Sequence, residues 1–367
     1  MMAGLKNHTN SPNYYLLLFI VASSLAISAA SAARSPEDRP PLAVKSAYYP
    51  SWITTLPPSS INTSLFTHIF YAFLAPNNAT FKFEVSNSTA ASLVGFTSAL
   101  RYARPPAKAL FSVGGEGSGA FFALMAAKPS SRRAFISSCI EVARKFGFDG
   151  VDLDWEFPQS PNEASLLGLV MKEFRSAIKK EAQITSRPPL LLTAAVYFSA
   201  DFFLAAAPYS YPAASMSRSL DWVNVMSYDY NGAWSNTTGP NSALFDPSSD
   251  VNTIFGLKSW IRAGMPKEKI VMGLSVYGRT WQLNDPVADN RFGATAIGPG
   301  RGNGVLTFAE VDGLVNESGA TVVYDVDTVS LYTVVGSSWI SFDNAFTINT
   351  KIGFAQALGI RGYFFGP

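Results

Sequence analysis

Short apolar runs alternate with longer amphipathic stretches from residue 43 onward. This alternation is typical of parallel strands joined by helices, because each crossover helix must cover the face of the sheet that the strands form. Eight such runs predict an α/β fold in which the strands close into a (β/α)8 barrel. The expected strands cover residues 44–49, 68–73, 109–113, 150–154, 190–196, 222–226, 270–274 and 362–365.

Helical periodicity fits between these runs, for example at residues 131–146 and 163–181. The stretch between the seventh and eighth strands is too long for one crossover helix. It is rich in glycine and contains short β-prone pieces such as residues 321–324. We therefore expect a small α+β insertion at about residues 280–345, within a barrel domain that covers residues 33–367.

The first residues have the order of a secretory signal peptide. Lys6 precedes an apolar stretch at residues 14–27, and small residues follow up to Ala32. We predict a signal peptide at residues 1–32, cleaved after Ala32 or Ala33. The alternative is a membrane anchor, but the apolar stretch is short, two serines interrupt it and no basic cluster follows.

Secretion changes how several other residues are interpreted, because it places the chain outside the cell or in the vacuole. N-glycans then become possible at sequons, and disulfides become possible between cysteines. The single Cys139 has no partner in the chain and is expected to be a buried, inert thiol in a helix. The five sequons beyond the predicted cleavage site lie at Asn62, Asn78, Asn87, Asn236 and Asn316.

Composition excludes several classes of function. The chain is 48% hydrophobic and only 15% charged, its net charge is +2, and it has no run of Lys and Arg that would follow a phosphate backbone. Nucleic acid is therefore not an expected partner, and nothing predicts an interface, so we expect a monomer. The only histidines are His8, in the predicted signal peptide, and His68, in an apolar strand. A histidine-based metal site is therefore not expected, and a catalytic triad would have one candidate base.

The fourth strand carries the candidate chemistry. Residues 149–156 read Asp-Gly-Val-Asp-Leu-Asp-Trp-Glu. Side chains alternate across a strand, so Asp152, Asp154 and Glu156 share one face, with Cα atoms roughly 6.6 Å apart along the row. An ionised carboxyl in this row disfavours ionisation of the next one, so at least one of the three should keep its proton near neutral pH. A protonated carboxyl can donate to the leaving oxygen of an acetal, and Glu156 lies at the strand end where barrel active sites form.

Two other interpretations of these acids are weaker. A divalent metal needs oxygens that converge on one point, whereas an extended row spreads them. A solvated edge is also disfavoured, because apolar residues flank this strand as in a buried barrel strand.

The glycine-rich stretch at residues 112–119 could indicate phosphate binding, but it lacks the Gly-Lys-Ser/Thr ending of such loops. We expect neither a metal nor a cofactor.

The acidic run resembles the family 18 glycoside hydrolase signature D-x-x-D-x-D-x-E, and most of residues 43–365 resemble plant class V chitinases. Three further motifs occur in the family's order. Ser-Val-Gly-Gly at 112–115 is similar to S-x-G-G, Met-Ser-Tyr-Asp at 226–229 to M-x-Y-D, and Tyr-Gly-Arg at 277–279 to Y-G-R.

This resemblance implies a chitinase that cleaves β-1,4 linkages between N-acetylglucosamine units, with endo action expected. It implies substrate-assisted retention, in which the acetamido oxygen of the substrate attacks its own anomeric carbon. Glu156 would be the general acid and base, and Asp154 would orient the acetamido group. Asp152 would share charge or a proton with Asp154, and Tyr228 would hydrogen-bond the acetamido carbonyl.

The resemblance also implies residues that bind chitin or its oligosaccharides. Because sugar C–H faces pack on aromatic rings, we add two tryptophans as platforms for flanking sugars and assign Trp155 to the core. The positions implied by the resemblance are Tyr48, Phe73, Gly115, Met226, Asp229, Tyr277 and Arg279, and the added platforms are Trp281 and Trp339.

The end of the chain departs from the family pattern. Gly366 stands where family members have Trp, and the chain ends at Pro367, before the last helix that the family pattern implies. We therefore expect a barrel that resembles a C-terminally truncated chitinase. This departure motivates the alternative function, a catalytically impaired chitinase-like protein that binds carbohydrate as a lectin or an inhibitor.

Overall fold

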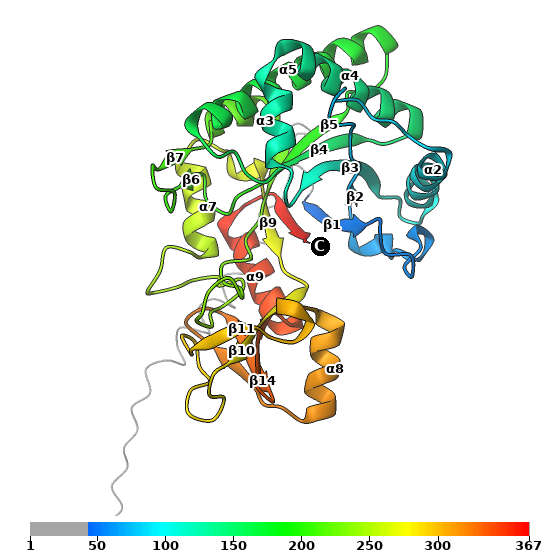
Figure 1. Ribbon diagram of the computed structural model, residues 1–367. Coiled ribbons are helices and arrows are strands. Elements are labelled where there is room, and N and C mark those ends of the chain that lie inside the picture. Colours follow the sequence, from blue (N-terminus) through cyan, green and yellow to red (C-terminus); the bar gives the residue numbers. More distant parts are fainter. Residues whose placement is uncertain (1–42, 367) are drawn as a thin grey trace, which may run out of the picture. The chain divides into compact units, whose positions relative to one another are not determined.

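The computed structural model describes residues 43–366, so the predicted signal peptide lies outside the described residues. Eight parallel strands form a closed barrel, which confirms the predicted fold class (Figure 1). Around the barrel the order is β1-β16-β9-β8-β5-β4-β3-β2, so the last strand in the sequence lies between the first and the seventh. The barrel strands are β1 (Val44–Pro50), β2 (His68–Ala72), β3 (Lys108–Gly115), β4 (Gly150–Trp155), β5 (Leu191–Val196), β8 (Trp222–Val225), β9 (Ile270–Leu274) and β16 (Gly362–Phe365).

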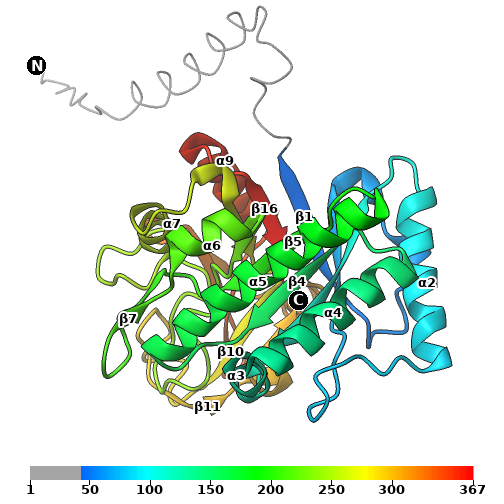
Figure 2. The same ribbon diagram turned by 90° about the horizontal axis from the view of Figure 1, so that it is seen from above.

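Helices cover the outside of the barrel, and α5 crosses in front of β4 and β5 in Figure 2. Their apolar faces pack on the outward residues of the strands, and Cys139 is buried in this layer as expected. The helix boundaries follow capping rules: Ser160 accepts a hydrogen bond from the amide of Glu163 at the start of α5. These helices are α2 (Asn87–Tyr102), α3 (Gly119–Ala127), α4 (Pro129–Phe146), α5 (Pro161–Thr185), α6 (Ala213–Ser219), α7 (Thr253–Arg262) and α9 (Ala345–Leu358).

A six-stranded antiparallel sheet with one helix is inserted between β9 and β16, as the fold prediction requires. The order is β11-β10-β15-β14-β13, and β12 pairs with β10. Its elements are β10 (Tyr277–Leu283), β11 (Ala296–Pro299), β12 (Val305–Thr307), α8 (Phe308–Ser318), β13 (Val322–Asp325), β14 (Ser330–Val335) and β15 (Ser338–Phe342). Short elements complete the described chain: β6 (Asp201–Phe202), β7 (Tyr209–Ser210), and the 3-10 turns Pro58–Ser60, Thr63–Leu65, Lys267–Lys269 and Arg301–Gly304.

A buried ion pair joins the insertion to the helix that leads back to the barrel. Lys351 on α9 contacts both carboxylate oxygens of Asp343 at 2.7 Å and donates to the carbonyl of Ser242 at 2.6 Å. Both charged residues are almost fully buried. Burial lowers the pKa of Lys351, and the facing carboxylate opposes that shift. Because either charge alone would be costly in this interior, the pair depends on both partners.

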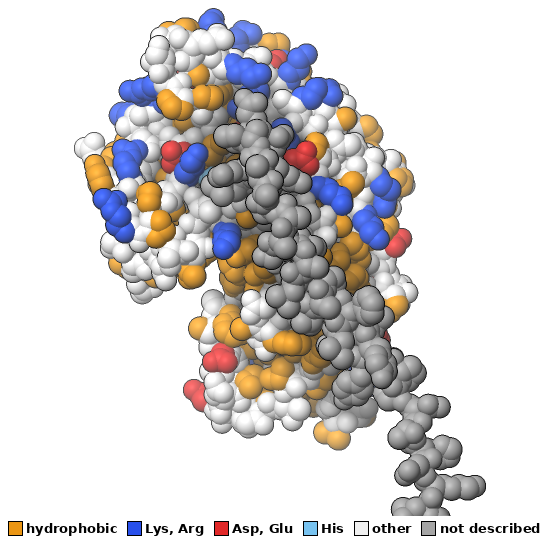
Figure 3. All heavy atoms as spheres, turned by 180° about the vertical axis from the view of Figure 1, so that it is seen from behind, with side chains coloured by type: hydrophobic (Ala, Val, Ile, Leu, Met, Phe, Trp, Pro, Cys, Tyr) orange, Lys and Arg blue, Asp and Glu red, His pale blue; other side chains and the backbone are white. Residues whose placement is uncertain are grey.

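On the face seen in Figure 3, Lys and Arg side chains are scattered over the upper part of the molecule, whereas the lower part shows mainly apolar and uncharged side chains with a few acids. Within residues 43–366, no helix combines the length and apolar character needed to cross a bilayer. The same part of the chain contains no group of three His, Cys, Asp or Glu side chains arranged to hold a metal ion.

Candidate active site

The alternation of side chains on β4 separates acids from apolar residues, as the sequence predicts. Val151, Leu153 and Trp155 are buried in the core between strands and helices. Trp155 stacks on Phe122 with ring centroids 5.4 Å apart, which fits its predicted core role. The acidic residues of β4 occupy the other face, so strand geometry alone directs them into the barrel.

Asp152 lies deepest and is surrounded by hydroxyl donors. Tyr48 and Ser112 donate to one carboxylate oxygen at 2.9 and 2.8 Å, and Thr193 donates to the other at 2.5 Å. Burial raises the pKa of Asp152, and these three hydrogen bonds oppose the rise because they stabilise the charged form. This arrangement holds a carboxylate in the middle of the barrel.

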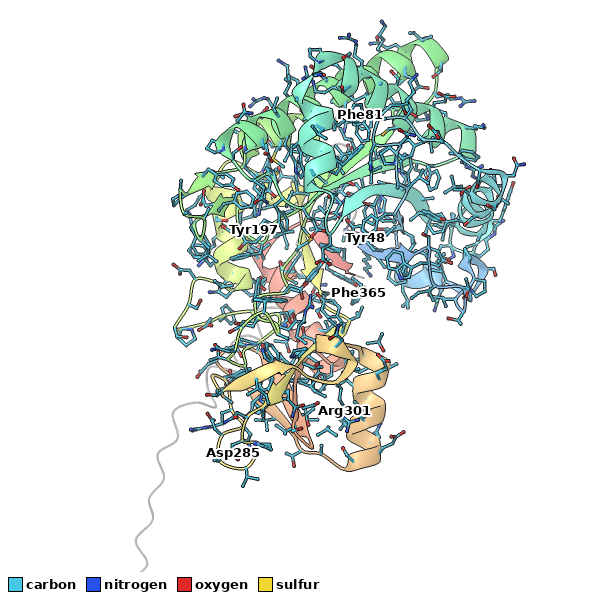
Figure 4. The ribbon with its side chains drawn as sticks, in the orientation of Figure 1. Tyr48, Phe81, Tyr197, Asp285, Arg301 and Phe365 are labelled. Atoms are coloured by element: carbon cyan, nitrogen blue, oxygen red, sulfur yellow. The ribbon has the colours of Figure 1, made fainter. Side chains whose placement is uncertain are left out.

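A second layer of hydrogen bonds orients Tyr48, which is labelled in Figure 4. Its hydroxyl accepts from the amide nitrogen of Asn224 at 3.0 Å, and the amide oxygen of Asn224 accepts from the Trp222 indole at 2.9 Å. Sequence reasoning missed Asn224 and Thr193. The available signal was a polar residue at an inward position of an otherwise apolar strand, where an unsatisfied polar group would be costly.

Asp154 lies above Asp152 and is 3% exposed. Burial and the charges of Glu156 and Asp152 raise its pKa well above the usual range, and a hydrogen bond to Glu156 adds to the rise. Its Oδ1 is buried and has no hydrogen-bond partner among the described residues. The backbone of β3 runs so close to the backbone of Asp154 that residue 114 must be glycine. A Cβ at Gly114 would lie 1.9 Å from the Asp154 carbonyl oxygen.

Glu156 follows β4 and is half-buried. Burial raises its pKa to about 7, and the nearby charges of Glu116 and Asp229 contribute, while the hydrogen bond with Asp154 opposes the rise. A carboxyl with this pKa holds its proton in mildly acidic solution and can release it at neutral pH. Glu156 therefore has the protonation range that general acid and base catalysis needs.

Two overlapping cavities meet at Glu156. The first has a volume of about 510 Å³ and the second about 670 Å³. They share Glu116, Glu156, Met226, Tyr228, Asp229 and Arg279, so together they form one groove that continues on both sides of the acid. The predicted residues Tyr48, Phe73, Gly115, Met226, Tyr228, Asp229, Tyr277 and Arg279 all line the first cavity, together with Asp154 and Glu156.

Strand β10 brings part of the insertion into the groove. Arg279 contacts both carboxylate oxygens of Asp229 at 2.7 Å, and the Tyr277 hydroxyl donates to the same carboxylate at 2.7 Å. Asp229 has a φ of 59°, an unusual conformation for a residue other than glycine. The Arg279 guanidinium also lies over the Trp234 ring, 5.1 Å from its centroid.

Tyr228 projects between the barrel end and the groove. Its ring centroid lies 6.0 Å from that of Phe364 and 6.1 Å from that of Tyr277. The backbone at Gly366 closely approaches its hydroxyl, since a Cβ at Gly366 would lie 2.5 Å from that oxygen. Tyr228 in this position therefore leaves no room for a side chain at residue 366.

The prediction for Trp281 and Trp339 is wrong. Both side chains are 0% exposed and pack against each other inside the insertion, with ring centroids 5.3 Å apart. A sugar cannot stack on a fully buried ring. The exposed tryptophans of the groove are Trp52, which is 60% exposed and stacks parallel to Phe73 in the first cavity, and Trp234, which is 64% exposed in the second.

The candidate base His68 has no part in this groove. Burial and nearby positive charges lower its pKa to about 4, and its ring packs edge-on against Trp222. Its Nδ1 lies 2.8 Å from the Thr67 hydroxyl. His68 is thus a neutral packing residue of the barrel, and the chemistry of the groove rests on carboxyls and tyrosines.

Comparison with known proteins gives consistent matches along the barrel. Residues 45–365 match the family described as Glycosyl hydrolases family 18. Class V chitinase CHIT5b of Medicago truncatula is 50% identical over 311 residues, which cover 84% of this chain and 82% of that protein. Nod factor hydrolase protein 1 of the same plant is 50% identical over 322 residues, covering 86% of this chain and 83% of that protein. The crystal structure of a GH18 chitinase from Cycas revoluta in complex with (GlcNAc)3 matches with a TM-score of 0.84 and 38% identity, covering 88% of this chain and 94% of that one.

Proposed function

The chain belongs to glycosyl hydrolase family 18 and is a glycoside hydrolase of the chitinase type, and on this premise we propose that it cleaves β-1,4 linkages between N-acetylglucosamine units by substrate-assisted retention. One observation carries the mechanism. One carboxylate oxygen of Asp154 is buried with no hydrogen-bond partner among residues 43–366, and Asp154 lines the same cavity as Glu156. A substrate group that donates a hydrogen bond would satisfy it, and the acetamido N–H of the sugar is such a group.

In the first step the acetamido oxygen forms a bond to the anomeric carbon while the bond to the leaving sugar oxygen breaks. Glu156 gives its proton to that oxygen. Asp154 accepts the acetamido N–H, which holds the attacking oxygen in place, and the Tyr228 hydroxyl donates to the acetamido carbonyl. The cationic oxazolinium intermediate then lies above the Asp152 and Asp154 pair, where a poorly hydrated negative charge stabilises it strongly.

In the second step Glu156, now a carboxylate, takes a proton from water as the water oxygen attacks the anomeric carbon. The acetamido oxygen leaves, so the product keeps the β configuration. The groove continues on both sides of Glu156, which supports cleavage within a chain. Its exposed rings at Trp52 and Trp234 lie on the two sides and would stack on flanking sugars.

The test is hydrolysis of a chitin oligosaccharide by wild type, Glu156→Gln and Asp154→Asn, with Glu141→Gln as a matched control. Glu141 is an exposed acid on α4 outside the groove. We expect Glu156→Gln to lower kcat by about 10²–10⁴-fold while oligosaccharide binding persists, since general acid catalysis is worth that much. NMR of early products should show the β anomer.

Full turnover by Glu156→Gln, or an α anomer as first product, would refute the mechanism. Binding without turnover by wild type would support the alternative, a chitinase-like carbohydrate-binding protein.

We also propose that the protein is secreted and carries N-glycans. All five sequon asparagines are exposed, which supports attachment of glycans. N-terminal sequencing of the secreted protein should begin after Ala32 or Ala33. Its mass should fall after enzymatic removal of N-glycans, and a mature protein that still begins at Met1 would contradict the proposal.

A further inference from the structure

Glu116 is a charged residue of the groove that contacts no substrate group in the proposed mechanism. It follows β3, it is exposed, and it lines both cavities. Among residues 43–366 it has no hydrogen bond or ion pair. Other acids of the groove have side-chain partners: Asp229 forms an ion pair with Arg279, and Asp154 shares a hydrogen bond with Glu156.

The backbone fixes where Glu116 can reach. Gly114, Gly115 and Gly117 all have positive φ, at 122°, 90° and 81°, so the chain turns sharply on both sides of Glu116. At Gly115 a Cβ would lie 2.9 Å from the Phe73 ring, so this turn is pressed against the aromatic wall of the first cavity. The backbone of Glu116 is thus fixed beside the Phe73 wall of the first cavity, and its side chain lines both cavities.

A chain of N-acetylglucosamine units offers this carboxylate hydroxyl and N–H donors but no positive charge. Removal of an acetyl group exposes an amine, which is an ammonium ion in mildly acidic solution. We propose that Glu116 is a specificity-determining residue that binds the ammonium group of a glucosamine unit next to the cleaved linkage, so that the groove accepts partially deacetylated chitin. This inference rests on the proposed function. The cleaved unit itself must keep its acetyl group, because that group supplies the attacking oxygen.

The test compares kcat/KM of wild type and Glu116→Gln on a fully acetylated chitin hexamer and on a partially deacetylated hexamer, at mildly acidic pH and low salt. We expect the ratio of the deacetylated to the acetylated substrate to fall about two- to fivefold in the variant, as for one solvent-exposed ion pair. Added salt should reduce the difference. The same Glu156 cleaves both substrates, so any change in its acidity cancels in the ratio.

Glu141→Gln removes the same charge outside the groove and should leave the ratio unchanged. An unchanged ratio in Glu116→Gln, with both rates altered together, would overturn the proposal. The dissociation constants of the two hexamers should also be measured for Glu156→Gln with and without Glu116→Gln, because binding needs no turnover. Failure of wild type to cleave the acetylated hexamer would count against the proposed function, whereas an affinity ratio that ignores Glu116 would count against this inference.

Discussion

The proton on Glu156 depends on residues from three different segments. Glu116 follows β3, Asp229 follows β8, and Asp154 lies on β4, which Glu156 directly follows. The two separate acids favour the protonated form because their charges repel the carboxylate. Asp229 is partly neutralised by Arg279, which leaves Glu116 as the neighbour whose charge a single substitution can remove cleanly.

At this scale we predict a change in pH dependence. Glu156 must be protonated to act as the acid, so its pKa sets the alkaline limb of kcat/KM. Glu116→Gln removes a neighbouring negative charge, makes the Glu156 carboxylate less unfavourable and should move this limb to lower pH. The profile should be measured with the fully acetylated hexamer. A limb that stays in place, or that moves equally in Glu141→Gln, would show that Glu116 does not influence the acid.

The acids of β4 could be predicted because strand geometry alone sets their direction. Glu116 could not, since its position depends on a glycine turn whose conformation no periodicity reveals. The error at Trp281 has a different cause. Tyr277, Arg279 and Trp281 occupy every second position of β10 and so share one face, but only the first two line the groove. Trp281 lies in the core of the insertion, opposite Trp339 on β15.

Among the elements, β10 therefore has two roles. Its first residues complete the groove, and its later residues form the core of the insertion with β11 and β15. The position of Arg279 therefore depends on the packing of the insertion, whereas the acids of β4 are positioned by the barrel. A substitution that disrupts the core of the insertion should therefore displace Tyr277 and Arg279 in the groove.

A pair of tryptophan substitutions separates these roles. Trp281→Ala should lower the free energy of unfolding by about 3–5 kcal/mol, because it leaves a large cavity in a closed core. Trp52→Ala should change it by no more than about 0.5 kcal/mol, since the ring is on the surface, but should weaken oligosaccharide binding. Urea denaturation and titration calorimetry would measure the two quantities. Equal loss of binding without loss of stability in Trp281→Ala would restore that residue as a sugar platform.

The barrel strands could be located from sequence because strands buried on both faces appear as short apolar runs. The strands of the insertion were harder. β11 and β12 are short, and each is defined by pairing with the distant β10. Their boundaries depend on partners that a local pattern does not reveal, so the sequence predicted an α+β insertion but not its strand order.

For the whole molecule, Glu156 lowers the free energy of unfolding at neutral pH. Glu156 has a pKa of about 7 when folded and 4.5 as its ordinary value. Below pH 4.5 the folded and unfolded states are both protonated. As pH rises towards 7 the unfolded chain releases this proton and the folded one keeps it, so stability falls. The loss is at most about 3 kcal/mol for this group, from the size of the shift.

We therefore predict that Glu156→Gln is more stable than wild type at neutral pH and that its advantage shrinks towards pH 4.5. The amide cannot ionise, so it avoids the cost of a buried carboxylate. Urea unfolding curves for both proteins across this pH range would measure the difference. A stability difference that is constant with pH would mean that the acidity of Glu156 does not differ between the folded and unfolded chain.

The position of β16 also constrains how the protein is made. This strand lies between β1 and β9, so the barrel cannot close until residues 362–365 have left the ribosome. Until then β1 has one unpaired edge, and the channel that will hold Tyr48 and Asp152 is open to water. Nascent chains should thus expose an unpaired strand edge until residues 362–365 have been made, which makes them clients for chaperones that shield such edges.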